Sequence, residues 1–227
     1  MAMPIRWRTS IEEWIWQNSI DLVVYRFSKT LLFLVCLLPA AGLGWQWWHD
    51  RLGANPIEAI SKDTGIWALR LLLVTLAVTP LRRVTGWHGL MRYRRMLGLF
   101  AFFYAVLHLG IYLWLDQFFL WEEILLDIRE RPFITVGFAT FLILLGLAVT
   151  SPRAIVRRMG GRRWQGFHRL VYVAAAGGVI HYWWLVKADV RDPLFYALLL
   201  GGLLAARLFY SRRVTALLHR SGRTISI

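Results

Sequence analysis

Long apolar stretches separated by short charged segments dominate the sequence. Each stretch is continuously apolar, unlike a half-buried strand, and approaches the ~20 residues that a helix needs to cross ~30 Å of hydrocarbon. A helix also satisfies its own backbone hydrogen bonds inside lipid. The pattern therefore predicts an all-α membrane protein, a bundle of six transmembrane helices within residues 27–210. The predicted spans cover roughly residues 27–48, 64–81, 97–115, 133–150, 167–186 and 194–210.

The two ends of the chain differ from the spans. In residues 1–26, apolar positions such as Ile11, Trp14 and Ile15 recur among acids. This spacing predicts a cytoplasmic segment that forms a short amphipathic helix on the membrane surface, and a disordered segment would fit the same residues. Glu12 and Glu13 interrupt any signal-peptide core, so we do not interpret the segment as a cleavable signal. Residues 211–227 are predicted to be a basic cytoplasmic tail.

The charged residues between the spans predict the orientation of the bundle. Segments on one side of the predicted membrane hold 18 basic residues, whereas the loops on the other side hold 6 basic residues and ten acids. Short loops rich in Lys and Arg stay in the cytoplasm, so both termini are expected there. The outer loops are left with a net negative charge, which favours an exported partner with a basic surface.

Composition narrows the class of protein further. The chain is 58% apolar and 15% aromatic with a mean hydropathy of +0.49, yet its net charge is +14. A soluble domain with so little polar sequence is not expected, and a nucleic-acid binder would place its basic residues among polar neighbours. The one cysteine, Cys36, excludes disulfides, cysteine-rich zinc sites, iron–sulfur clusters and covalent haem attachment through paired cysteines.

Few ionisable groups fall inside the predicted spans, and two of them share a depth. His108 lies 13 residues beyond Arg95 and eight residues before Asp116, and His181 lies eight residues before Asp189. At 1.5 Å per residue, each imidazole is ~12 Å from the outer surface. The full set is His108, His168, His181, Arg70, Arg169 and Arg207.

Paired histidines without a nearby carboxylate or cysteine suit the two axial positions of a haem b iron. Zinc would need more ligands, and no methionine lies in a span to serve as an axial ligand. An iron with two axial histidines has no open position, so the site would transfer electrons rather than bind a substrate. Glycines on the third and fifth spans leave room for a flat macrocycle, or simply for close helix packing. The alternative is that each histidine bonds a backbone carbonyl or lines a polar seam.

Arg70 and His168 are two further candidates for haem binding. Arg70 is predicted in the same layer as the histidine pair, where its guanidinium would bind haem propionates, or else extend to the lipid interface. His168 is predicted near the inner surface and points ~140° away from His181 on an ideal helix. Only a π-bulge at Gly177-Gly178 would align the two. A second haem there would lack an identified partner ligand, because Arg94 and Arg95 occupy that level of the third span.

Several short motifs resemble a known family. They are Gly53-Ala54-Asn55-Pro56, Arg94-Arg95-Met96-Leu97-Gly98-Leu99, Leu107-His108-Leu109, Trp164-Gln165-Gly166-Phe167-His168 and Ile180-His181-Tyr182. The chain resembles the MsrQ (formerly YedZ) family, the haem-binding membrane subunits of a bacterial periplasmic methionine sulfoxide reductase system, within the ferric-reductase-like transmembrane superfamily. The resemblance covers nearly all of the six predicted spans.

The resemblance implies cofactors and partners. His108, His168 and His181 match the haem-associated histidines of the family, the cofactor would be haem b, and FMN has been associated with its cytoplasmic side. Arg94 and Arg95 belong to a basic cluster that would bind an FMN phosphate or an acidic reductase, or would only contact lipid headgroups. Membrane quinol or a cytosolic flavin reductase would give electrons, and a periplasmic molybdopterin enzyme would receive them, across the bacterial inner membrane.

Two other classes of function stay open. A ferric or other metal reductase would use the same transmembrane core, although the superfamily often carries two histidines on the third span and this chain has only His108 there. Such an enzyme would normally carry a fused flavin domain, and the residues after Tyr210 are too few for one. A non-redox transporter or scaffold would need no haem and would tend to show paired, interrupted spans, which we do not find.

Overall fold

The computed structural model describes the backbone of residues 5–186 and 188–220, and the side chains of 23–186 and 188–210. Within these residues the chain is helical and contains no strand, so the all-α prediction is confirmed. Contacts divide the chain into two units, residues 1–49 and 50–227, which are described separately.

The first unit is a single long helix. Helix α1 covers Ile5–Trp48, which is 44 residues, and continues without a break from the predicted surface segment into the first span. Residues 1–4, and the side chains up to residue 22, lie outside the described residues. The surface placement of residues 1–26 therefore stays a prediction, as does the tail, of which residues 221–227 are not described.

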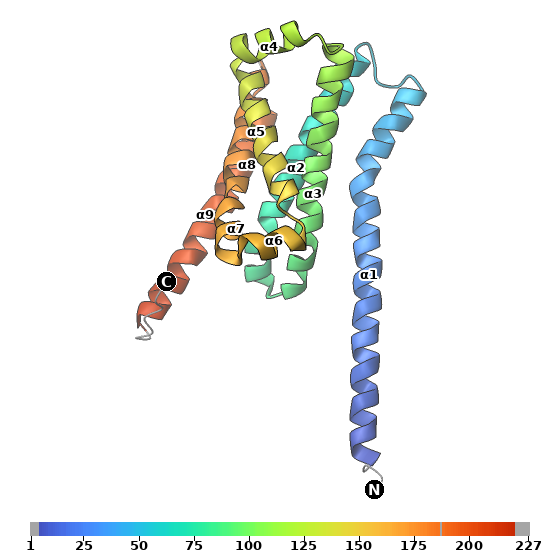
Figure 1. Cartoon of the computed structure of the whole chain (residues 1–227), viewed down its shortest axis with the longest axis vertical. Coiled ribbons are helices and arrows are strands. Elements are labelled where there is room, and N and C mark those ends of the chain that lie inside the picture. The colour runs from blue at the N-terminus through green and yellow to red at the C-terminus, as the bar shows by residue number, and fades with distance from the viewer. Residues whose placement is uncertain (1–4, 187, 221–227) are drawn as a thin grey trace. The chain divides into compact units, whose positions relative to one another are not determined.

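The second unit is a helical bundle (Figure 1). Helix α2 packs most extensively against α3, and α5 against α8, while α9 contacts both α8 and α2. Helix α4 lies across one end of this bundle, and the short helices α6 and α7 lie at the opposite end. The bounds are α2 Pro56–Thr85, η1 His88–Leu90, α3 Met91–Ile111, η2 Tyr112–Asp116, α4 Trp121–Glu130, α5 Pro132–Val149, α6 Arg153–Met159, α7 Gly161–Phe167, α8 Leu170–Leu185 and α9 Arg191–Arg220.

Local sequence signals explain where α2 begins and ends. The Asn55 side chain accepts a hydrogen bond of 3.3 Å from the backbone N–H of Glu58, and its own amide donates to the Glu58 carboxylate at 3.0 Å. Pro56 occupies the first helical position, where the missing N–H has no cost. Gly86 then ends the helix in a left-handed conformation with a φ of 71°.

Among the described residues, five helices are long and apolar enough to cross a membrane: Val23–Trp48 within α1, α2, the continuous His88–Asp116, α5, and Arg191–Tyr210 within α9. The predicted span 167–186 forms α8, which has only 16 residues. At 1.5 Å per residue this is ~24 Å, shorter than the hydrocarbon core. The count of six spans is therefore not confirmed by helix length.

Helices α5 and α8 run antiparallel along their whole lengths. Phe167 lies against Gly146, Gly177 against Thr140, and His181 against Gly137. Helix α8 continues as a regular α-helix through Gly177 and Gly178. The π-bulge that would align His168 with His181 therefore does not occur there. These glycines instead allow close helix contact, since a Cβ at Gly177 would overlap the hydroxyl of Thr140. The one π-helical turn in the described residues, η2, follows α3.

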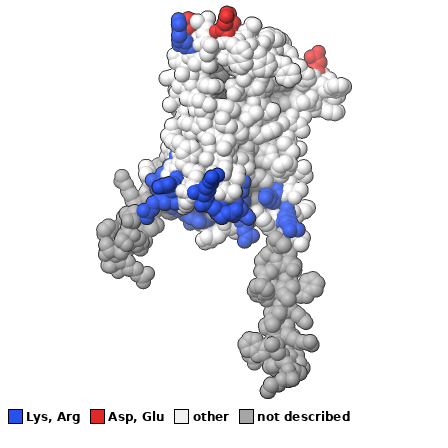
Figure 2. Space-filling view, in the orientation of Figure 1, with Lys and Arg blue, Asp and Glu red and all other residues white. Residues whose placement is uncertain are grey.

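Charge is segregated between the two ends of the bundle. Figure 2 shows most of the visible Lys and Arg side chains at the end that carries α6 and α7, and acids at the opposite end, where α4 lies. The structure therefore separates the basic and acidic loops as the sequence predicts.

We expect Gly177→Ala to destabilise the bundle by about 1–3 kcal/mol, the usual cost of overpacking a close contact. Thermal unfolding of the purified protein in detergent would measure the change. Gly201→Ala is the matched control, because a Cβ at that position on α9 meets nothing within 4 Å. Adding Thr140→Ala to Gly177→Ala should restore stability. Equal stability of Gly177→Ala and the control would contradict this account of the α5–α8 contact.

Candidate functional site

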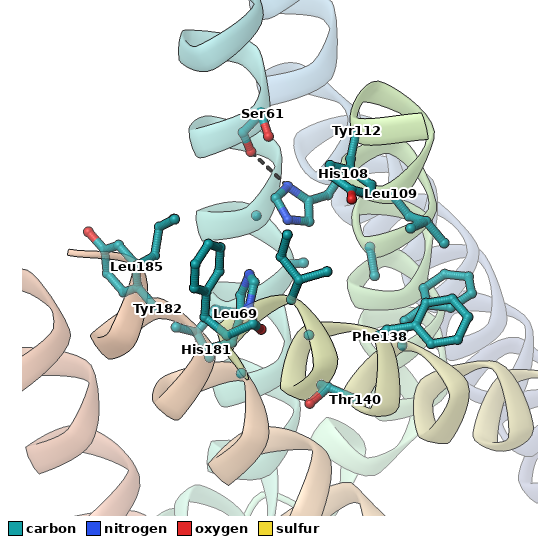
Figure 3. Close-up of a pocket in the computed structure, with 18 of the residues that line it drawn as sticks. Ser61, Leu69, His108, Leu109, Tyr112, Phe138, Thr140, His181, Tyr182 and Leu185 are labelled. Atoms are coloured by element: carbon teal, nitrogen blue, oxygen red, sulfur yellow. Dashed lines mark hydrogen bonds between the residues drawn. The ribbon is translucent and has the colours of Figure 1, made fainter. Parts of the chain in front are cut away.

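A cavity of about 360 Å³ lies among α2, α3, α5 and α8, near the end covered by α4 (Figure 3). Its volume falls within the range of ordinary ligand pockets. Most of its wall is apolar, formed by side chains such as Leu69, Leu72 and Phe141. Polar groups from four helices and the connections between them also reach it. They are Ser61, Lys62, His108, Tyr112, Asp116, Arg131, Thr140, His181 and Tyr182.

His108 and His181 meet in this cavity. His108 comes from α3 and His181 from α8, and their ring centroids are 6.0 Å apart with the planes inclined at 77°. Figure 3 shows both rings among the residues that line the cavity. The depth estimate from sequence thus placed the two imidazoles together correctly, although their role as metal ligands stays a prediction.

Hydrogen bonds to the backbone orient both rings. Nδ1 of His108 lies 2.9 Å from the carbonyl oxygen of Ser61, and Nδ1 of His181 lies 2.6 Å from that of Phe133. Because a carbonyl only accepts hydrogen bonds, each Nδ1 must carry the proton and donate. Each neutral ring then keeps a lone pair on Nε2, and no group in the described part of the chain bonds to either Nε2.

Two glycines leave space for these rings. A Cβ at Gly65 on α2 would lie 3.2 Å from the His108 ring, and a Cβ at Gly137 on α5 would lie 2.7 Å from Nδ1 of His181. Each ring therefore packs against a stretch of bare backbone. The glycines predicted from sequence to leave room for a cofactor lie on the third and fifth spans, and neither Gly65 nor Gly137 was given that role.

The histidine pair suits a metal whose remaining ligands are supplied by a cofactor. Two imidazoles that each bind one metal through Nε2 at about 2 Å would have ring centroids about 6 Å apart, close to the separation observed. No group of three or more His, Cys, Asp or Glu side chains within ligand distance occurs among the described residues. A haem supplies four nitrogens of its own, and the apolar wall suits its macrocycle, so the residues present fit this group.

An acidic group at the outer end of the cavity connects α4 to the end of α3. Asp127 on α4 is 8% exposed. Its carboxylate accepts hydrogen bonds from the Tyr112 hydroxyl at 3.0 Å and the Gln117 amide at 3.3 Å, and pairs with Nε of Arg131 at 3.1 Å. From the sequence these acids were counted only as charge of the outer loops, and no helix was predicted there. Acids in the first turn and apolar residues at helical spacing were the available signal.

Arg70 lies outside the cavity. Its Nε donates to the Tyr196 hydroxyl on α9 at 2.8 Å, and its guanidinium lies 5.0 Å from the centre of the Trp67 ring. Depth along the chain did not determine which face of α2 Arg70 occupies. The basic residues that line the cavity are Lys62 and Arg131, which the sequence analysis did not select.

His168 lies away from the pair, at the turn between α7 and α8. Its Nε2 is 3.0 Å from the Thr150 hydroxyl, and its ring lies 4.0 Å from that of Trp164. Arg94 on α3 interacts electrostatically with this ring. Neither Arg94 nor Arg95 lines the cavity, so the structure does not bring these three residues to the histidine pair.

Comparison with known proteins places this site in a class. Residues 64–179 match the family model described as the ferric reductase like transmembrane component. The matched range includes His108 and His168 and ends two residues before His181. The bundle is therefore a ferric-reductase-like transmembrane component.

Curated relatives identify the family more closely. The chain is 51% identical over 185 residues to a protein of Herminiimonas arsenicoxydans, with 81% of this chain and 85% of the relative covered. It is 55% identical over 180 residues to a protein of Azospira oryzae, with 79% of this chain and 77% of the relative covered. It is 51% identical over 201 residues to a protein of Rhodospirillum rubrum, with 88% of this chain and 95% of the relative covered. All three are named protein-methionine-sulfoxide reductase heme-binding subunit MsrQ, and this chain belongs to the MsrQ family.

Proposed function

We propose that this protein is a membrane haem b subunit that passes electrons from the quinol pool, or from a cytosolic flavin reductase, to a periplasmic molybdopterin enzyme that reduces methionine sulfoxide in proteins. One observation supports this most strongly. Two imidazoles from different helices lie with centroids 6.0 Å apart, and backbone carbonyls hold the proton of each on Nδ1. Such histidines are ready to bind iron through Nε2.

In this proposal His108 and His181 would hold the haem iron through Nε2. Bound haem would supply reversible one-electron chemistry. The carbonyls of Ser61 and Phe133 hold the two rings in orientation, as outer hydrogen-bond partners commonly do for ligating histidines. The apolar wall excludes water from the ring pair. The protein would therefore carry out electron transfer and no substrate chemistry of its own.

We further propose that the domain 27–210 crosses the bacterial inner membrane six times with both termini in the cytoplasm. Support comes from α8, whose ends reach the two ends of α5: His168 contacts Thr150, and His181 contacts Phe133. A helix paired with α5 over this whole length crosses the same thickness, although it has only 16 residues. The basic end would then face the cytoplasm and the histidine cavity the periplasm.

The basic end is the proposed place for further cofactors. His168 with Arg94 and Arg95 lies on this side, and a second haem or an FMN phosphate would bind near them. The positive charge of Arg94 near the His168 ring supports this assignment, because it would attract an anionic phosphate or propionate group. Nearby, the Tyr172 hydroxyl is buried and has no hydrogen-bond partner in the described part of the chain, so a ligand acceptor would satisfy it.

The match to the ferric reductase like model favours a second candidate, a metal reductase built on the same haem core. Both candidates need the same ligands, and they differ in the electron acceptor. Ferric reduction by purified, prereduced protein, at a rate above that of transfer to a periplasmic acceptor, would favour this second function.

The first test is the absorption spectrum of purified variants. His108→Ala and His181→Ala should each abolish the low-spin b-type spectrum of the outer site, because each removes one axial ligand. His88→Ala, an exposed position outside the cavity, should retain it and is the matched control. If His168 ligates a second haem, His168→Ala should remove about half of the total haem. Normal haem content in both the His108 and His181 variants would refute the pair.

Gly137→Ala should also impair the site without removing a ligand. The new methyl group would meet Nδ1 of His181 at 2.7 Å, so the ring must move from its carbonyl partner. We expect lower haem occupancy and a changed low-spin signal in electron paramagnetic resonance. Gly110→Ala, near His108 on α3, meets nothing within 4 Å and should behave as the wild type. An unchanged signal in Gly137→Ala would contradict the proposed orientation of His181.

The electron-transfer role has its own test. Cells that lack the protein should lose quinol-driven reduction of oxidised periplasmic proteins, and the wild-type chain should restore it while His108→Ala should not. The measurement is the rate at which methionine sulfoxide in oxidised periplasmic proteins is reduced in intact cells supplied with a reduced quinol. Persistence of the normal rate in cells without the protein would rule out this role.

A further inference from the structure

We propose that Arg131 binds the propionate carboxylates of the haem and that Asp127 is the positioning residue that holds Arg131 in place. This inference rests on the proposed haem function of the cavity. It assigns the carboxylate-binding group to the connection between α4 and α5 rather than to Arg70.

The polarity of the cavity supports this assignment. The imidazoles lie among apolar side chains, whereas Arg131 and Lys62 are the cationic residues in the described cavity lining. They come from the ends of α5 and α2 on the side that α4 covers. Haem b has the same asymmetry, because its macrocycle is apolar and both carboxylates leave one edge. A haem whose carboxylates face this end would place its apolar body between the two histidines.

The guanidinium of Arg131 is held by one partner and does not use all of its hydrogen-bond donors. Its Nε lies 3.1 Å from Oδ1 of Asp127, and the side chain is 55% exposed. No other partner of the Arg131 side chain is found among the described residues, so its terminal nitrogens remain available as donors. An arginine presents such donors in a planar fork that matches a carboxylate.

Asp127 is suited to position Arg131, whose positive charge offsets that of the carboxylate in an ion pair of 3.1 Å. Its other oxygen accepts hydrogen bonds from Tyr112 and Gln117, so the buried carboxylate is satisfied on both sides. Asp116 also lines the cavity and adds negative charge at this end. Without Arg131, incoming carboxylates would face both acids. Loss of this one cation should therefore weaken binding more than loss of an isolated surface charge would.

The same short segment also sets the position of a ligand. Arg131 is the residue before α5, and two residues later the carbonyl of Phe133 holds His181. The same backbone segment thus orients the His181 imidazole and positions the Arg131 guanidinium. Arg70, by contrast, is bonded to Tyr196 and lies outside the cavity lining.

Reconstitution with two forms of the cofactor tests the inference. Apoprotein of the wild type and of Arg131→Gln is loaded with haem b or with its dimethyl ester, which lacks the carboxylate charge. We expect Arg131→Gln to release haem b about tenfold faster than the wild type, as befits a lost charge-assisted hydrogen bond. Its reduction potential should fall, since a nearby cation favours the reduced iron. With the dimethyl ester, wild type and variant should release the cofactor at the same rate.

Matched variants separate this role from a structural one. Arg129→Gln removes an exposed arginine of α4 that does not line the cavity, and Arg70→Gln tests the earlier candidate. Both should behave as the wild type with either cofactor. Asp127→Asn should release haem b faster but not the ester, and Arg131→Lys should recover part of the retention. These two variants decide the question if Arg131→Gln does not fold.

Several outcomes would overturn the inference while leaving the haem function intact. One is equal release of haem b from the wild type and the Arg131 and Asp127 variants. Another is a loss that is the same for haem b and its ester, which would indicate a structural effect. A selective effect in Arg70→Gln would return the role to Arg70. Failure of the wild type to bind haem through His108 and His181 would instead overturn the proposed function itself.

Discussion

Two hydrogen bonds from imidazole to backbone carbonyl determine the arrangement of the site. An N–H group inside an apolar bundle must find an acceptor, and here the acceptors are carbonyls of α2 and of α5, the helices that pack beside the histidine-bearing α3 and α8. Once both Nδ1 atoms are occupied in this way, the lone pairs left on the rings are those of Nε2. The alternative expected from sequence, a histidine bonded to a backbone carbonyl, is therefore observed. It is compatible with metal binding, because it uses only one nitrogen of each ring.

Close packing of the helices brings the imidazole rings within hydrogen-bond distance of these carbonyls. Gly137 and Gly65 carry no side chain where the His181 and His108 rings approach, and Gly177 brings α8 close to α5. The α5–α8 pair joins the two ends of the bundle, because His181 is bound near the start of α5 and His168 at its end. The glycines thus contribute in two ways, through helix contact and through the space left for rings.

Sequence reasoning predicted the helical class and the shared depth of His108 and His181, because apolar length and the rise per residue are properties of the chain alone. It could not predict which face of a helix a residue occupies, since the rotation of each helix depends on its neighbours. For that reason Arg70 was predicted beside the histidine pair, whereas the cationic residues in the described cavity lining are Arg131 and Lys62. The short helix α4 was missed because its acids were counted as loop charge. Helix α8 shows a different limit. Its pairing with α5 along the bundle cannot be predicted from its own length.

The separation of the two ends of the bundle links the number of cofactors to the identity of the electron donor. His168 and His181 are 13 residues apart in the sequence, which is ~20 Å along a helix. Electron transfer slows steeply with distance, so a donor at the basic end would need an intermediate carrier near His168 and Arg94. A quinol that diffuses within the bilayer could approach the histidine cavity from the side and would need no such carrier. A second haem or a flavin at the basic end therefore favours a cytosolic donor, whereas a single haem at His108 and His181 favours quinol.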